Sequence, residues 1–195
     1  MANITYEPAD IAIYIQDRGM VLKEKSLVAF DAVNSKIIAF GTEAEYIAKG
    51  NTENILIVSP LRQGMIVDYP VAVSLFTHLL YKALGKKPLR KPAIAICVPD
   101  NITEVEKKTI EDIIIQIGAR ELMFIDFPIE QYMSKMPEKF PKEYKRFKVI
   151  IEITKDNPEA YIAEELENIL KYARKQNISI ERVAELFQAE KSKIV

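Results

Sequence analysis

The sequence has one cysteine, one histidine and no long apolar run, and the shortages of cysteine and of apolar runs each exclude a class of protein. A single cysteine, Cys97, excludes a disulfide framework and suits a reducing compartment. Because it lies in the apolar run 93–98, we expect a buried small side chain. No apolar stretch approaches the roughly 20 residues of a spanning helix, and the N-terminus lacks the basic and apolar regions of a signal peptide. We therefore expect a soluble, cytoplasmic protein.

An excess of charge of one sign is also missing. The 27 basic residues nearly balance the 28 acidic ones, so nothing attracts the chain to nucleic acid, and no nucleic-acid partner is expected. A hydrophobic fraction of 49% with 28% charged residues, over 195 residues, is typical of a globular protein with one good-sized core.

The few residues that could carry chemistry are isolated from one another. His78, on a predicted helix, has no cysteine or second histidine near it in sequence, so a structural or surface role is favoured over a metal ligand or base. Four aspartates fit helix starts, loops or strand ends equally well, and we predict no catalytic role for them: Asp68, Asp100, Asp112 and Asp126. No metal site is expected.

The first third of the chain has the pattern of a β meander. Residues 11–15 and 20–24, separated by a turn, predict a hairpin, and residues 26–30 and 36–40 predict a second pair of strands. Thr42 followed by Glu45 is a capping-box pattern, which predicts a short helix to about residue 48. Residues 55–58 predict a further strand.

The remainder alternates between helix and strand patterns. Residues 70–84 have helical spacing and end at Gly85, and residues 92–98 are typical of a strand buried on both faces. Thr103 with Glu106 predicts another capping box, before a strand at 122–125, so we expect a parallel crossover. A short helix at 128–133, a strand at 147–153 and two helices within 158–187 follow.

Four segments resemble, in the same order and at similar spacing, segments of one protein family. Residues 19–29 (GMVLKEKSLVA) resemble GIVLNEPSVVA, and residues 57–69 (IVSPLRQGMIVDY) resemble IRPMKDGVIADF. Residues 98–110 resemble VPxGxTxVERRAI, and residues 118–128 (GARELMFIDFP) resemble GAREVFLIEEP. These segments are those of the MreB rod-shape family of bacterial actins. The resemblance is strong over about 11–133 and weaker to about 157.

The resemblance implies an α/β fold, namely an actin-like (ribonuclease H-like) subdomain with a mixed five-stranded sheet flanked by helices. It also implies a small outer lobe at about 30–59, within a domain 1–157. We expect the second half of the actin fold to be missing. The helices of 158–195 should then pack on the same domain, since their apolar spacing would cover the sheet face left exposed.

Family members hold ATP between two glycine-rich hairpins, because only glycine lets backbone N–H groups approach phosphates closely. The first hairpin, DLGTANT, falls on residues 5–11, where Glu7 takes the glycine position and Pro8 removes a donor. The second, VVDIGGGT, falls on residues 150–157, with Thr154, Lys155 and Asp156 at its glycines. The resemblance therefore implies that no phosphate cradle, and no nucleotide cofactor, remains.

Two further positions concern the chemistry of that site. The glutamate that positions the attacking water in the family falls on Phe127, which can neither orient water nor accept a proton. Glu152 retains an acid at the aspartate of the second hairpin, although a strand-end charge is the simpler interpretation. The resemblance thus implies a degenerate ATPase with no catalytic residue and no metal.

A basic loop offers a separate surface, comprising Lys86, Lys87, Leu89, Arg90 and Lys91. In the family the corresponding loop carries exposed apolar residues that help it bind the inner membrane leaflet. The resemblance therefore implies weak peripheral contact with the inner face of the membrane, at roughly 1 kcal/mol per basic residue near anionic lipid. A solvated loop is the simpler alternative.

Together these features predict a non-catalytic MreB-like structural or regulatory protein. It would bind itself or a full-length bacterial actin filament, in cell-shape or cytoskeletal organisation. One alternative is the ATP-binding half of a split actin-like ATPase, completed by a second polypeptide. Another is a relic, or a module recruited to an unrelated partner.

Overall fold

The computed structural model describes residues 8–50, 54–62, 64–99, 102–125, 129–133, 135 and 139–154. The chain divides into two units, 1–156 and 157–195, and every described residue lies in the first. The helices predicted beyond residue 158, and their packing on the domain, lie outside the described residues.

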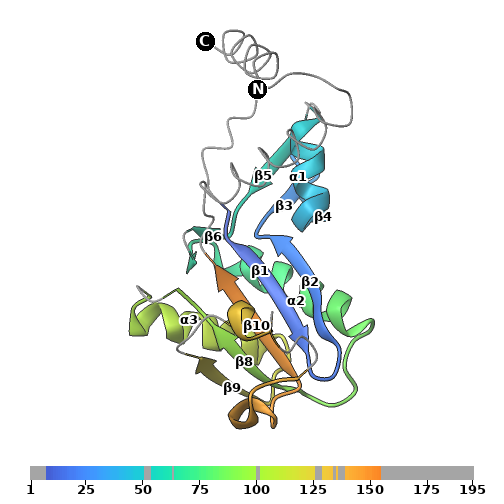
Figure 1. Ribbon diagram of the computed structural model, residues 1–195. Coiled ribbons are helices and arrows are strands. Elements are labelled where there is room, and N and C mark those ends of the chain that lie inside the picture. Colours follow the sequence, from blue (N-terminus) through green and yellow to red (C-terminus); the bar gives the residue numbers. More distant parts are fainter. Residues whose placement is uncertain are drawn as a thin grey trace, which may run out of the picture. The chain divides into compact units, whose positions relative to one another are not determined.

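A mixed sheet of five strands, in the order β2-β1-β10-β8-β9, forms the body of the described unit. Its antiparallel part consists of β1 (Asp10–Ile15), which pairs with β2 (Gly19–Lys25) on one side and β10 (Val149–Thr154) on the other. β10, β8 (Ala93–Cys97) and β9 (Glu121–Ile125) run parallel. The predicted hairpin and parallel crossover are therefore confirmed. The last described strand, orange in Figure 1, lies in the middle of the sheet.

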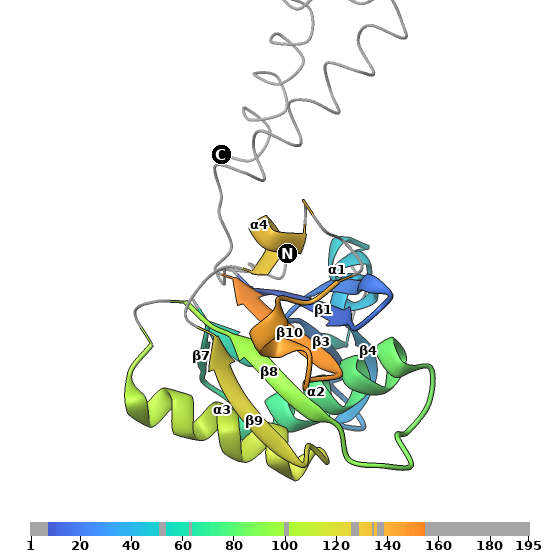
Figure 2. The same ribbon diagram turned by 60° about the horizontal axis from the view of Figure 1, so that its bottom comes forward.

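Helices cover both faces of this sheet. α2 (Tyr69–Leu84) and α3 (Glu104–Gln116) lie against one face, and the short α4 (Ile129–Met133) lies on the other (Figure 2). α2 begins where the Asp68 side chain accepts a hydrogen bond from the Val71 amide. It ends at Gly85, whose φ of 75° is easily reached only without a side chain. The capping box predicted for Thr103 and Glu106 is present at the start of α3.

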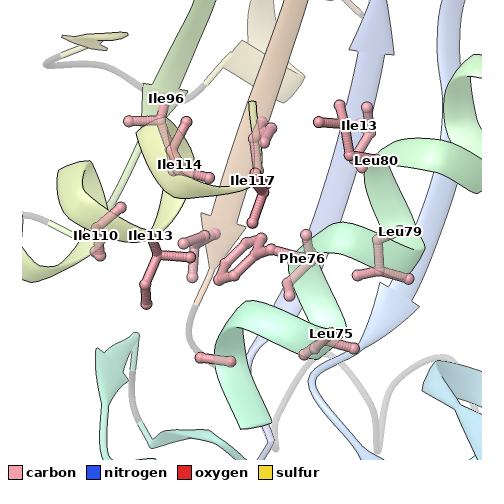
Figure 3. Packing of buried hydrophobic residues seen from close by; sticks show 14 of the residues in the cluster. Ile13, Leu75, Phe76, Leu79, Leu80, Ile96, Ile110, Ile113, Ile114 and Ile117 are labelled. Atoms are coloured by element: carbon pink, nitrogen blue, oxygen red, sulfur yellow. The ribbon is translucent and has the colours of Figure 1, made fainter. Parts of the chain in front are cut away.

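Alternation along the strands divides the core between the two faces. On β10, Ile151 and Ile153 pack toward α2 and α3, whereas Ile150 belongs to the cluster on the α4 side. Figure 3 shows the first cluster, in which Phe76 of α2 is surrounded by isoleucines of α3 and of the sheet. Both faces of the central strands are buried, which explains why residues 93–97 form a continuous apolar run.

A separate three-stranded sheet, in the order β4-β3-β5, forms a small lobe where the sequence predicted one. It contains β3 (Val28–Asp31), β4 (Lys36–Phe40) and β5 (Ile55–Val58). α1 (Gly41–Lys49) covers one face with Ala44 and Ile47. The hairpin of β6 (Leu61–Arg62) and β7 (Met65–Ile66), which was not predicted, leads from the lobe into α2, and a short 3-10 helix at Lys142–Tyr144 precedes β10.

The capping box predicted for Thr42 is wrong. α1 begins at Gly41, so its N-cap is Phe40, two residues before Thr42, and the Phe40 side chain makes no capping hydrogen bond. The Thr42 amide and hydroxyl instead both donate to a carboxylate oxygen of Glu24 on β2, each at 2.6 Å. A carboxylate from another element satisfies the helix N-terminus more strongly than a threonine hydroxyl does, because the acceptor is charged.

Candidate functional site

The carboxyl ends of the parallel strands β10, β8 and β9 meet at one edge of the five-stranded sheet. Ligands of open α/β sheets bind at this edge, and the degenerate nucleotide site was predicted here. The described residues at the edge include Glu152 and Thr154 of β10 and Cys97 at the end of β8. α4 begins beside them, since its first amide contacts Glu152.

Glu152 is the buried acid of this edge, with 2% of its surface exposed. One carboxylate oxygen accepts a hydrogen bond from the Tyr14 hydroxyl at 3.0 Å. The other accepts from the backbone amides of Ile129 at 2.9 Å and Glu130 at 3.4 Å, so the carboxylate ties α4 to the sheet. The prediction of a strand-end charge is therefore wrong. β10 is central, and a residue pointing to its α4 face is enclosed.

The environment of Glu152 opposes its ionisation. Burial, the largest influence, raises the pKa of Glu152 above its ordinary value, while the hydrogen bonds from the Glu130 amide, the Tyr14 hydroxyl and the Ile129 amide oppose the rise. Burial and the neighbouring Glu152 also raise the pKa of Tyr14. Each carboxylate oxygen thus already has a donor within the protein, which leaves little capacity to bind a ligand.

Two of the predicted hairpin residues lie near one another at the same end of the sheet. Thr154 ends β10 opposite Asp10, and Pro8 lies two residues before Asp10 and bridges to Arg62. Asp10 forms an ion pair with Lys25 at 2.9 Å, so this acid also has an internal partner. The other predicted positions lie outside the described residues: Glu7, Phe127, Lys155 and Asp156. Within the described ranges, no group of three His, Cys, Asp or Glu side chains could hold a metal ion.

A second buried acid, Glu24, was missed by the sequence analysis. It is 7% exposed, and besides Thr42 it accepts a hydrogen bond from the ammonium group of Lys82 at 2.6 Å. Gly41, with φ of 60°, lies so close that an added Cβ would overlap the Glu24 carboxylate. β2, α1 and α2 therefore meet at one charged group that joins the small lobe to the main sheet. No local pattern reveals it, because its partners are 18 and 58 residues away.

The surroundings set the charge states of this junction. Burial alone would raise the pKa of Glu24, but the hydrogen bonds from Lys82 and Thr42 outweigh it and hold the pKa below its ordinary value. The ring of His78 stacks on Phe40 with centroids 4.2 Å apart, which supports the predicted structural role. Burial and the charge of Lys82 lower the pKa of His78, so the neutral ring is favoured.

The basic loop connects α2 to β8. All five of its named residues are exposed: Lys86, Lys87, Leu89, Arg90 and Lys91. Leu89 stands out because 95% of its surface is exposed. In the part of the chain that the structure describes, no helix is long and apolar enough to cross a membrane.

The mixed sheet, the crossover helices and the small lobe define an actin-like fold. Among solved structures, MreB 5 of Spiroplasma citri bound to AMPPNP aligns with a TM-score of 0.54 and 26% identity, over 60% of this chain and 35% of that one. The family model for MreB/Mbl protein matches residues 4–134, and the chain belongs to this family. The predicted fold class and resemblance are therefore confirmed.

Curated relatives include the cell shape-determining proteins of two bacteria. Mbl of Bacillus subtilis is 33% identical over 120 residues, which cover 62% of this chain and 36% of the relative. MreB of Haemophilus influenzae is 31% identical over 141 residues, which cover 69% of this chain and 40% of the relative. The chain thus matches well under half the length of these relatives.

Proposed function

We propose that this chain is a non-catalytic, MreB-like structural or regulatory protein, which binds itself or a full-length bacterial actin filament in the organisation of cell shape. The observation that carries the proposal is the hydrogen bonding of Glu152. At the edge where a ligand would bind, both carboxylate oxygens of the buried Glu152 already accept hydrogen bonds, from the Tyr14 hydroxyl and from the first amides of α4. An acid used to hold a helix in place is poorly suited to serve a bound metal or nucleotide.

The retained family segments support protein–protein binding, rather than catalysis, as the function of the chain. The segments that resemble the family lie on the helices and strands that build the domain, whereas the hairpin positions have lost their glycines. Pro8 has no N–H to offer a phosphate, and Thr154 replaces a glycine at the end of β10. A family surface combined with an impaired site is consistent with an adaptor, cap or regulator in the cytoplasm.

Calorimetry and co-sedimentation test this proposal together. With magnesium present, we expect no heat from ATP or ADP added to the full chain. We also expect the chain to pellet with a polymerised full-length bacterial actin, and to stay in the supernatant when that actin is kept unpolymerised. Micromolar nucleotide binding by the chain would overturn the non-catalytic reading and favour the split-ATPase alternative, in which a second polypeptide completes the site.

The basic loop supports a weaker contact with the inner face of the membrane. Its cationic side chains surround Leu89, whose exposure suits insertion among lipid headgroups. We expect the chain to pellet weakly with anionic phospholipid vesicles at low salt, and not with neutral vesicles. The Lys86→Glu, Lys87→Glu double variant should lose this binding, since four charge units of change at roughly 1 kcal/mol each exceed a weak attraction.

A charge reversal elsewhere serves as the control for the loop. Lys36 on β4 is also exposed, and Lys36→Glu should leave vesicle binding unchanged. Equal pelleting with neutral vesicles, or equal losses in the loop and control variants, would show that the loop does not recognise the membrane.

A further inference from the structure

The small lobe has one protected edge and one unprotected edge. β4 carries Lys36, and its pairing with β3 shifts register between Ala29 and Phe30, as at a β-bulge. Charges and bulges are the usual means by which proteins prevent an edge strand from pairing with another chain. β5, at the opposite edge, reads Ile-Leu-Ile-Val, and its strand partner among the described residues is β3 alone. Neither protective device is present on β5.

The hydrogen bonds of the lobe show which backbone groups of β5 face outward. The Ala32 amide donates to the Asn54 carbonyl at 2.8 Å, so residues 32 and 54 form a hydrogen-bonded pair. In an antiparallel ladder such pairs alternate, and Phe30 with Leu56 is therefore the next one. The N–H and C=O groups of Ile55 and Ile57 consequently point away from β3, toward the open edge.

The side chains of β5 divide between two environments. Ile55 and Ile57 pack in the cluster beneath α1, whereas Leu56 lies on the other face and is 55% exposed. Leu56 is opposite Phe30, and Phe30 is opposite Ile37, so three apolar side chains cross that face of the sheet in a row. Leu56 is the exposed end of this row.

We infer that β5 pairs with β5 of a second copy of this chain, antiparallel, about a two-fold axis at Leu56. This register places Ile55 opposite Ile57 of the second copy and the reverse, which joins outward-facing backbone groups in two reciprocal hydrogen-bonded pairs. Leu56 then faces Leu56 of the second copy and continues the apolar row across the junction. The partner is a second copy because the edge is uncharged and complementary to itself, as a two-fold contact requires.

The contact deepens the self-association proposed above and rests on it. A four-residue strand buries a small area, so the dimer should be weak and should depend on concentration. It merges the small lobes of two copies into one continuous sheet and leaves the carboxyl edge of the main sheet unchanged.

Cysteine cross-linking tests the register directly. Facing residues of a non-hydrogen-bonded pair have Cα atoms about 4.5 Å apart, which is within the range of a disulfide. The full-length Leu56→Cys variant should therefore form a disulfide-linked dimer under mild oxidation. The native Cys97 should not interfere, since it is 5% exposed. The matched control is Ile38→Cys, at an exposed position on the protected edge, which should stay monomeric on a non-reducing gel.

Sedimentation velocity separates this contact from self-association in general. The wild-type chain should dimerise as its concentration rises, and Leu56→Lys should weaken the dimer at least ~10-fold because like charges would meet at the axis. Ile38→Lys should not. If the wild type self-associates while Leu56→Lys has no effect and Leu56→Cys does not cross-link, the β5 contact is overturned and the proposed function stands. A wild type that neither self-associates nor pellets with filaments overturns both.

Discussion

Replacing Glu24 by glutamine is expected to lower the free energy of unfolding by about 2 kcal/mol at pH 7, as for the loss of hydrogen bonds to a buried charge. The wild-type carboxylate accepts from Lys82 and from both donors of Thr42. Glutamine retains one acceptor oxygen but loses the charge that pairs with Lys82. The matched replacement, Glu152→Gln, should leave the free energy of unfolding unchanged or raise it. The buried surroundings of residue 152 disfavour the negative charge of the wild-type carboxylate. In the variant, the Tyr14 hydroxyl can accept a hydrogen bond from the glutamine side-chain amide as readily as it donates one to Glu152 in the wild type.

The two acids should also respond to pH in opposite directions. The pKa of Glu24 is lowered in the fold, so its stabilisation is complete above the unfolded value of about 4.3 and is lost as the pH falls through the folded pKa. The pKa of Glu152 is raised, so the fold is favoured when this acid is protonated. Its contribution is lost as the pH rises from the unfolded value through the folded pKa.

Urea unfolding of Glu24→Gln and Glu152→Gln at several pH values checks the opposite pH dependences of the two acids. The stability difference between wild type and Glu24→Gln should shrink as the pH falls below about 4.3. Glu152→Gln should lack the decline that the wild type shows as Glu152 ionises. A loss of more than about 2 kcal/mol in Glu152→Gln at pH 7 would mean that the ionised acid stabilises α4, contrary to this account.

Replacing Phe76 by alanine is expected to lower the free energy of unfolding by about 3–5 kcal/mol, the usual range for a large buried side chain. Phe76 is 1% exposed and lies between α2, α3 and the sheet (Figure 3). Its neighbours belong to paired strands of the sheet and to α3, which packs on that sheet, so they can close the resulting cavity only in part.

The control for Phe76 is Leu89→Ala, which removes an apolar side chain that is 95% exposed. This variant should stay within about 0.5 kcal/mol of the wild type. Both can be measured by urea denaturation followed by circular dichroism. A loss below about 1 kcal/mol in Phe76→Ala would show that the two helices do not depend on this contact.

Helices and strands whose signals come from residues close together in the sequence could be predicted. The α2 helix has apolar residues at helical spacing, a proline in its first turn and Gly85 after its last residue, and its predicted limits agree with the structure to within one residue. β8 is a continuous apolar run because both of its faces are buried, and the sequence analysis predicted this strand from that run. These signals are local, so they survive without knowledge of the fold.

Two Thr-x-x-Glu patterns show where local reasoning stops. At Thr103 the pattern forms the expected capping box, in which the exposed Thr103 and Glu106 side chains each accept a hydrogen bond from the other residue's backbone amide. At Thr42 it does not, because Glu24 approaches from β2 and takes both donors of the threonine. The same Thr-x-x-Glu motif thus forms different hydrogen bonds, depending on which side chains the tertiary structure places next to it.

The sequence by itself determined the family, the actin-like fold class, and most helices and strands, and it shows that residues 5–11 and 150–157 contain no glycine. The tertiary structure decided the use of the two buried acids and the central place of β10. It also decided which edge of the small lobe is left without charge or bulge. The reason is separation along the chain. Tyr14 and Glu152 are 138 residues apart, and Glu24 and Lys82 are 58 apart, so each contact exists only once the sheet and its helices have brought the pair together.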